Sequence, residues 1–205
     1  MSKPIMLITG TSRGVGLACA EYFQDRYEII GIARTPGEFV TEQGSVADET
    51  FRQYVIDKYT PNVFINNAGI GNSILPHEVF RINAEASACF MLGFYQKMKT
   101  GNIINIASWL STITHNPGGS FGELAYQSTK KLVKELSKEL SGKKNKPVKV
   151  TSLEPQMIDT DLIKGMMTFG KLMTPIYIAE TIEWVLNQPT WVNVDSICIS
   201  NHRES

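Results

Sequence analysis

The sequence has little of what marks a metal protein, a secreted disulfide protein or a membrane protein. Its three cysteines, Cys19, Cys89 and Cys198, lie far apart and show neither metal-ligand nor redox spacing. Each stands among apolar neighbours, so we expect all three to pack as small buried side chains in a reducing compartment. No apolar run approaches the length that crosses a bilayer, and the first residues lack a signal-peptide core. We therefore expect a cytoplasmic protein.

Net charge is also absent. Twenty basic residues balance twenty acidic ones over 205 residues, which excludes the field of one sign typical of proteins that bind nucleic acid or anionic membranes. The three histidines, His77, His115 and His202, form no metal set and are interpreted as ordinary polar residues. The basic run 143–146 is interpreted as a solvated turn. We expect neither nucleic acid nor a membrane as a partner.

Short apolar runs alternate with helical patterns along the whole chain. This alternation predicts an α/β fold, a doubly wound parallel β-sheet of Rossmann type with helices on both faces. There is no repeat and no linker, so we expect one domain over residues 1–205. The predicted strands are 5–8, 28–33, 63–65, 101–106, 148–153 and 194–199.

The edge strand after the second predicted strand, or the crossover that leads to it, is expected to be shortened or missing. Residues 39–41 resemble a strand, but they follow residue 33 too closely for a crossover helix. We therefore predict a loop or an irregular edge at 37–44, and about six parallel strands in all.

A glycine-rich turn directly follows the first predicted strand. Its spacing, Gly10-x-x-x-Gly14-x-Gly16, stands between a strand and a helix, where such glycines hold a dinucleotide pyrophosphate. Gly10 permits the sharp exit from the strand, and the later glycines let the pyrophosphate and the helix approach the backbone. A surface turn without a ligand is the alternative that the glycines alone leave open.

Tyr126 and Lys130 are four residues apart in a helical run. Residues at this spacing lie one turn apart on one helix face, so the phenol and the ammonium can serve one site. A nearby ammonium favours the phenolate and lowers the pKa of tyrosine toward that of a group which transfers protons at neutral pH. By itself the pair is also common on solvated helix faces.

Taken together, the motifs resemble those of the short-chain dehydrogenase/reductase family over nearly the whole chain. The resemblance rests on five motifs in the family's order: Thr9-Gly10-x-x-x-Gly14-x-Gly16, Asn66-Asn67-Ala68-Gly69, Asn83, Ser108 after the strand 101–106, and Tyr126-x-x-x-Lys130.

The resemblance assigns four catalytic roles. Tyr126 would be the general acid or base, and Lys130 would lower its pKa and hold the nicotinamide ribose. Ser108 would bind the substrate oxygen; Ser111 is the nearest rival for this role. Asn83 would hold a water in a proton path from Lys130, or, in the alternative interpretation, would simply bind a backbone carbonyl.

The expected cofactor is NADP(H). The strand 28–33 ends at Arg34 without the acidic residue that selects NAD, and Arg34 can offer its guanidinium to a 2′-phosphate. Arg13 would approach the same phosphate from the glycine turn, as in NADP-preferring members that this chain resembles. The expected cofactor-binding residues are Gly10, Ser12, Arg13, Gly14, Val15, Gly16, Arg34, Ser45, Val46, Asn67, Ala68, Gly69, Tyr126, Lys130, Pro155, Gln156, Ile158 and Thr160.

Several departures from the family pattern leave a second function open. The loop 115–123 is longer than usual, Gln156 replaces a glycine, Ser45 replaces an acidic residue, and the lid 161–173 is small. The leading hypothesis is an oxidoreductase that interconverts a carbonyl and an alcohol in a small-molecule substrate. A homo-oligomer is one option for its assembly. The alternative is a non-catalytic dinucleotide sensor; a non-redox enzyme such as an epimerase is a distant third.

Overall fold

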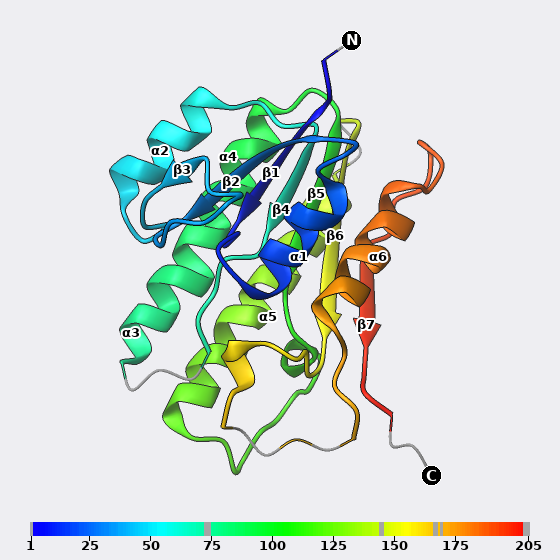
Figure 1. Cartoon of the computed structure of the whole chain (residues 1–205). Coiled ribbons are helices and arrows are strands. Elements are labelled where there is room, and N and C mark those ends of the chain that lie inside the picture. Colours follow the sequence, from blue (N-terminus) through cyan, green and yellow to red (C-terminus); the bar gives the residue numbers. More distant parts are fainter. Residues whose placement is uncertain (1, 72–74, 144–145, 166–167, 169, 203–205) are drawn as a thin grey trace.

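The computed structural model describes residues 2–71, 75–143, 146–165, 168 and 170–202. Its core is a parallel sheet in the order β3-β2-β1-β4-β5-β6-β7 (Figure 1). The predicted doubly wound α/β fold is confirmed. The strands are β1 Ile5–Thr9, β2 Glu28–Ala33, β3 Glu42–Gln43, β4 Val63–Asn66, β5 Gly101–Ile106, β6 Val148–Pro155 and β7 Ser196–Ile199.

Helices cover both faces of the sheet (Figure 1). One face carries α1 (Gly14–Phe23) and α6 (Pro175–Leu186), and the other carries α2 (Glu49–Lys58), α4 (Ser87–Lys97) and α5 (Phe121–Ser141). In β1, Met6 and Ile8 pack with α1 and α6, whereas Leu7 packs with α4 and α5. Successive side chains of a strand point to opposite faces, so a sheet covered on both sides needs continuous apolar runs like that of β1.

The helical segment that carries Asn83 is long and irregular. It begins as α3 (Pro76–Val79), continues as a π-helical segment η1 (Phe80–Ala86), and runs on into α4. Wide turns of this kind are rare and often lie at functional sites. Shorter 3₁₀ turns are η2 (Trp109–Ser111) and η3 (Asp161–Ile163).

The prediction of a missing edge strand is wrong, whereas the prediction of a shortened strand and crossover is confirmed, since β3 has two residues and no described helix precedes it after β2. β3 pairs in parallel with β2, Ile32 opposite Glu42 and Ala33 opposite Gln43, which makes seven strands. The crossover from β2 to β3 needs no helix, because its backbone at Phe39 passes directly against the backbone of Gly31. A Cβ on Gly31 would stand 1.7 Å from the Phe39 carbonyl oxygen, so only glycine allows this close passage.

Two cysteine predictions are also wrong. Cys19 is buried, but Cys89 and Cys198 are exposed. Cys89 lies on the outward face of α4, and Cys198 lies on the edge strand β7, so neighbouring apolar residues do not by themselves imply burial. No group of potential metal ligands occurs in the described part of the chain.

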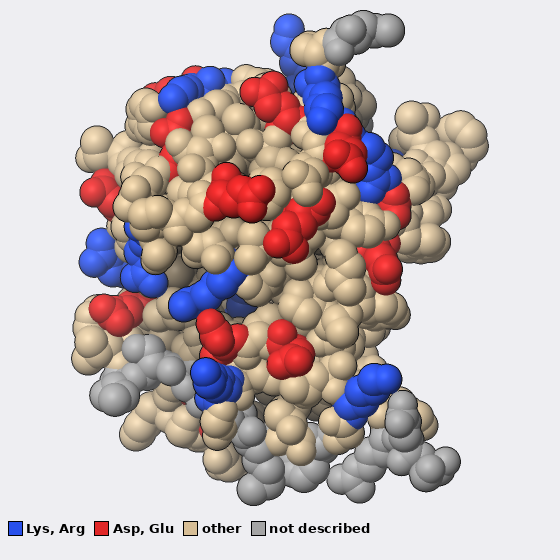
Figure 2. Space-filling view, in the orientation of Figure 1, with Lys and Arg blue, Asp and Glu red and all other residues tan. Residues whose placement is uncertain are grey.

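The surface agrees with the balanced composition. Acidic and basic side chains are interspersed over the face drawn in Figure 2. The basic run 143–146 falls partly outside the described residues. Among the helices of the described ranges, none is both long enough and apolar enough to span a bilayer.

Candidate active site

A cleft of about 490 Å³ opens at the carboxyl ends of the strands. It lies where the strand order reverses, because β1 is flanked by β2 on one side and β4 on the other. Parallel doubly wound sheets bind their ligands at such a switch point. Every residue that the sequence assigned to the cofactor lines this cleft, except Gly16.

The glycine turn is shaped for close contacts. Gly10 and Gly14 have φ values of 82° and 59°, in the left-handed region that favours glycine. Gly16 lies beneath the turn: a Cβ there would stand 2.1 Å from the Gly10 carbonyl oxygen. Helix α1 can therefore pack tightly against the turn, and no side chain caps its first N–H groups. These free N–H groups and the helix dipole favour an anion at this end of α1.

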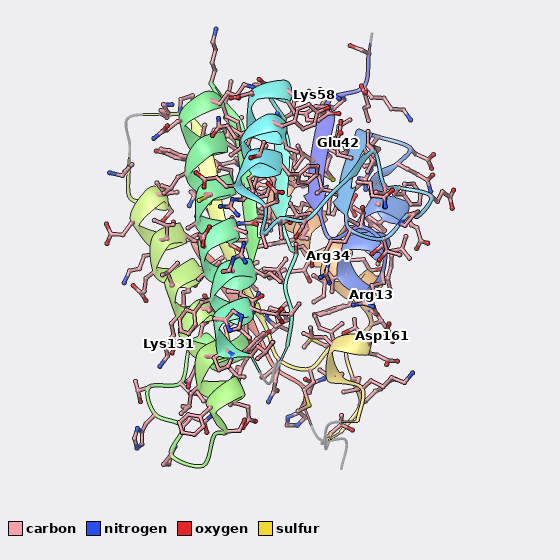
Figure 3. All side chains as sticks on the ribbon, turned by 90° about the vertical axis from the view of Figure 1, so that its left-hand side faces the viewer. Arg13, Arg34, Glu42, Lys58, Lys131 and Asp161 are labelled. Carbon is pink, nitrogen blue, oxygen red and sulfur yellow. The ribbon has the colours of Figure 1, made fainter. Side chains whose placement is uncertain are left out.

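The lining is electropositive. Among the described lining residues, the cations Arg13, Arg34, Lys130 and Lys164 face a single acid, Asp161. Figure 3 shows Arg13 between Arg34 and Asp161 along one side of the molecule. A cleft with this charge suits a negatively charged ligand.

Tyr126 and Lys130 both line the cleft from α5. The helix is started by a capping box, in which Ser120 and Glu123 bind each other's backbone N–H. The buried Lys130 Nζ donates a 2.7 Å hydrogen bond to the Ile106 carbonyl oxygen and lies 5.7 Å from the centre of the Tyr126 ring. The predicted spacing on one helix face thus brings both groups to one site.

The pKa values of this pair differ from expectation. Burial lowers the pKa of Lys130 to about 8. Burial of the hydroxyl also raises the pKa of Tyr126 above its usual range, and a hydrogen bond with the Ser108 side chain offsets only part of the rise. The pKa of Tyr126 is thus raised overall and not lowered, because burial of the hydroxyl is the largest cause of its shift; the lowering effect of Lys130 stays a prediction.

Ser108 is the serine whose side chain forms a hydrogen bond with the Tyr126 hydroxyl. It caps the turn η2, where its Oγ accepts a 3.2 Å hydrogen bond from Leu110 N. Ser111, the rival in sequence, instead donates its hydroxyl to the Ser108 carbonyl oxygen at 2.5 Å. The 3₁₀ turn thus assigns different partners to the two serines.

The side chain of Asn83 both accepts a hydrogen bond from the backbone and donates one to it. It is fully buried in η1; its Oδ1 accepts from Ile70 N at 2.9 Å, and its Nδ2 donates to Ile70 O at 2.8 Å. This interaction is of the kind that the alternative interpretation expected. It fixes the loop after β4 near Lys130, since a Cβ on Gly69 would lie 3.2 Å from Asn83 Oδ1 and 3.6 Å from Lys130 Nζ.

The lid segment is tied down at its base, which explains one departure from the family pattern. The Gln156 Oε1 accepts a 2.8 Å hydrogen bond from Asn201 N. The Asn201 side chain in turn binds both polar backbone groups of Met157 and the Lys171 carbonyl oxygen. Gln156 therefore has a structural partner that a glycine would lack.

The segment between Ser108 and the longer loop 115–123 is also anchored. Gln127 on α5 donates from Nε2 to the carbonyl oxygens of Leu110 and Ile113, each at 3.1 Å. Its buried amide links the helix of Tyr126 to the segment that carries Ser108.

Some lining residues were not predicted. Several adjoin the motifs that were recognised, and the rest come from η1 and from the lid 161–173, whose residues the sequence did not assign to the cofactor. They are Ile32, Ala33, Thr35, Gly44, Ile70, Gly71, Ile82, Ile106, Ala107, Asp161, Leu162, Ile163 and Lys164.

Comparison with known proteins agrees with this geometry. The family described as short chain dehydrogenase matches residues 4–168. The chain belongs to this family. An uncharacterized oxidoreductase of Staphylococcus epidermidis is 27% identical to this short-chain dehydrogenase, with 97% of each chain covered. Serine 3-dehydrogenase of Rhizobium radiobacter is 25% identical, covering 94% of this chain and 91% of its own. The closed form of a serine dehydrogenase complexed with NADP⁺ has a TM-score of 0.79 at 21% identity, with 95% and 94% covered.

Proposed function

We propose that this short-chain dehydrogenase is an NADP(H)-dependent oxidoreductase that interconverts a carbonyl and an alcohol by hydride transfer. The observation that carries the proposal is the meeting of Tyr126, Ser108 and Lys130 beside an electropositive cleft at the switch point of the sheet. A binding module would have no need of a phenol and a buried ammonium placed together.

The lining fits a nicotinamide dinucleotide. The tight glycine turn and the uncapped start of α1 suit its pyrophosphate, and Lys130 suits a ribose hydroxyl. When bound, the nicotinamide ring supplies or accepts the hydride. Serine dehydrogenase, of similar fold, is known complexed with NADP⁺, which supports a cofactor of this kind here.

The residues of the chain handle the proton. A raised pKa keeps the Tyr126 hydroxyl protonated at neutral pH, so Tyr126 can donate to a carbonyl oxygen during reduction and accept the proton in reverse. Ser108 lies next to the Tyr126 hydroxyl and can donate to the same oxygen, where charge develops. Lys130, whose pKa is lowered to about 8 by burial, has its Nζ 5.7 Å from the centre of the Tyr126 ring, so it can restore the proton through a bridging hydroxyl or water.

Two arginines support a preference for NADP(H). Arg13 and Arg34 both line the cleft, and no acidic residue from the end of β2 does so among the described residues. Guanidinium groups bind phosphate oxygens with charge-assisted hydrogen bonds. The sensor alternative has lost one of its supports, because Gln156 has a structural role at the base of the lid.

The test is steady-state oxidation of NADPH and NADH with a panel of aldehydes, ketones and keto acids. The reverse reaction is tested with small hydroxy acids, including serine, since a serine 3-dehydrogenase is among the relatives. We expect Tyr126→Phe to reduce kcat by about 10²–10⁴-fold while the Kd for the cofactor changes only a few-fold. Near-normal kcat in this variant would remove Tyr126 from the mechanism.

Cofactor preference is tested separately. In the wild type we expect kcat/KM to be higher with NADPH than with NADH, by roughly a hundredfold if both arginines contribute. Arg13→Ala combined with Arg34→Ala should abolish this preference. Equal efficiency with the two cofactors in the wild type, or a preference that survives in the double variant, contradicts the assignment.

A further inference from the structure

The start of the lid and the residue before it touch the rim of the cleft on two sides. Thr160 packs on the glycine turn, where a Cβ on Gly14 would lie 3.4 Å from Thr160 Cγ2. Leu162 packs on the opposite rim, where a Cβ on Gly71 would lie 3.3 Å from the Leu162 carbonyl oxygen. Asp161, between them, is the one acid among the described lining residues.

Asp161 is also the residue with which Arg13 forms an ion pair. Arg13 Nη1 lies 4.0 Å from Asp161 Oδ2, across the junction of the glycine turn and the lid. Arg34 lines the same cleft without an ion pair among the described residues. One of the two guanidinium groups assigned to the 2′-phosphate is therefore already next to a carboxylate, while the other is not (Figure 3).

We propose that Asp161 is a specificity-determining residue, the resident counter-ion of Arg13 with which the cofactor's 2′-phosphate competes for the guanidinium. The proposal rests on the proposed function, because it takes Arg13 as a ligand of the 2′-phosphate. Binding of the phosphate to Arg13 replaces the contact between the glycine turn and η3. Asp161 thereby weakens the discrimination for NADP(H) that the arginines provide.

The size of the effect is bounded by solvent. The Arg13 and Asp161 side chains are 72% and 61% exposed, so their interaction is that of a surface pair. Such pairs change an equilibrium by about 1.4- to fivefold, and salt screens them. We therefore expect a modest effect, largest at low ionic strength.

The experiment measures binding rather than turnover. Kd values are measured by calorimetry for adenosine 2′,5′-bisphosphate and for AMP. Because the two ligands differ only in the 2′-phosphate, the ratio of their Kd values reports the contribution of that phosphate to binding. Asp161→Asn should change that ratio in favour of the bisphosphate by about 1.4- to fivefold, and by less with added salt. In an Arg13→Gln background the same change should have no effect. Asp161→Ser tests the direction with a second side chain, and thermal unfolding checks that each variant is folded.

Asp159→Asn is the matched control. It removes the same charge two residues away, and Asp159 has no ion pair among the described residues. The proposal is overturned if Asp161→Asn leaves the ratio unchanged, if its effect persists without Arg13, or if Asp159→Asn reproduces it. In each case, NADPH turnover by the wild type would leave the proposed function standing. A wild type that binds neither nucleotide and oxidises no NADPH refutes the proposed function itself.

Discussion

Replacing Lys130 with methionine should change how the stability of the fold depends on pH. Lys130 is buried, and lowering its pKa from 10.5 to about 8 corresponds to roughly 3 kcal/mol that disfavours the charged ammonium in the folded state. Below pH 8 the lysine is charged in both the folded and the unfolded chain, so the fold carries the whole cost. Between pH 8 and 10.5 the lysine is neutral in the fold but charged in the unfolded chain, so stability rises with pH.

The magnitude follows from these two values. The wild type should gain roughly 2 kcal/mol of unfolding free energy between about pH 8 and pH 10, relative to Lys130→Met. At neutral pH the variant escapes the cost of the buried charge but loses the hydrogen bond to the Ile106 carbonyl oxygen, a loss of about 1–3 kcal/mol. The two effects oppose each other, so the pH dependence is the informative quantity.

Urea unfolding from about pH 7 to about pH 10 measures it. Lys138→Met, which changes an exposed lysine two turns further along α5, is the control, and its curve should run parallel to that of the wild type. Stability curves of the wild type and Lys130→Met that run parallel over the whole range would refute the reasoning. Under the proposed function, Lys130→Met is also expected to lose turnover.

Three other substitutions test the structure around the site. Gly31→Ala places a Cβ 1.7 Å from a backbone oxygen of the crossover to β3. We therefore expect this overpacking to lower the free energy of unfolding by several kcal/mol, measured by urea unfolding. Asn83→Ala removes two buried hydrogen bonds to Ile70 and should lower the unfolding free energy by about 2–4 kcal/mol; a change below about 0.5 kcal/mol contradicts the contact. Asn201→Ala should speed tryptic cleavage within 161–173, because both ends of the lid lose their anchor; unchanged cleavage contradicts this role.

The architecture and the location of the site were determined by local patterns in the sequence. Apolar strands that alternate with amphipathic helices can bury both faces only as a covered parallel sheet, as β1 illustrates. The glycine turn and the pair Tyr126 and Lys130 carry their geometry in their spacing, because glycine conformation and the helical repeat are properties of short segments.

Only the tertiary structure decided what depends on contacts between distant segments. The seventh strand exists because Gly31 lets the backbone at Phe39 pass against it, a distance that no local pattern contains. The pKa of Tyr126 rises because the fold buries its hydroxyl, which the spacing to Lys130 could not reveal. The ion pair of Arg13 with Asp161 joins residues far apart in the chain, and it depends on where the lid folds back.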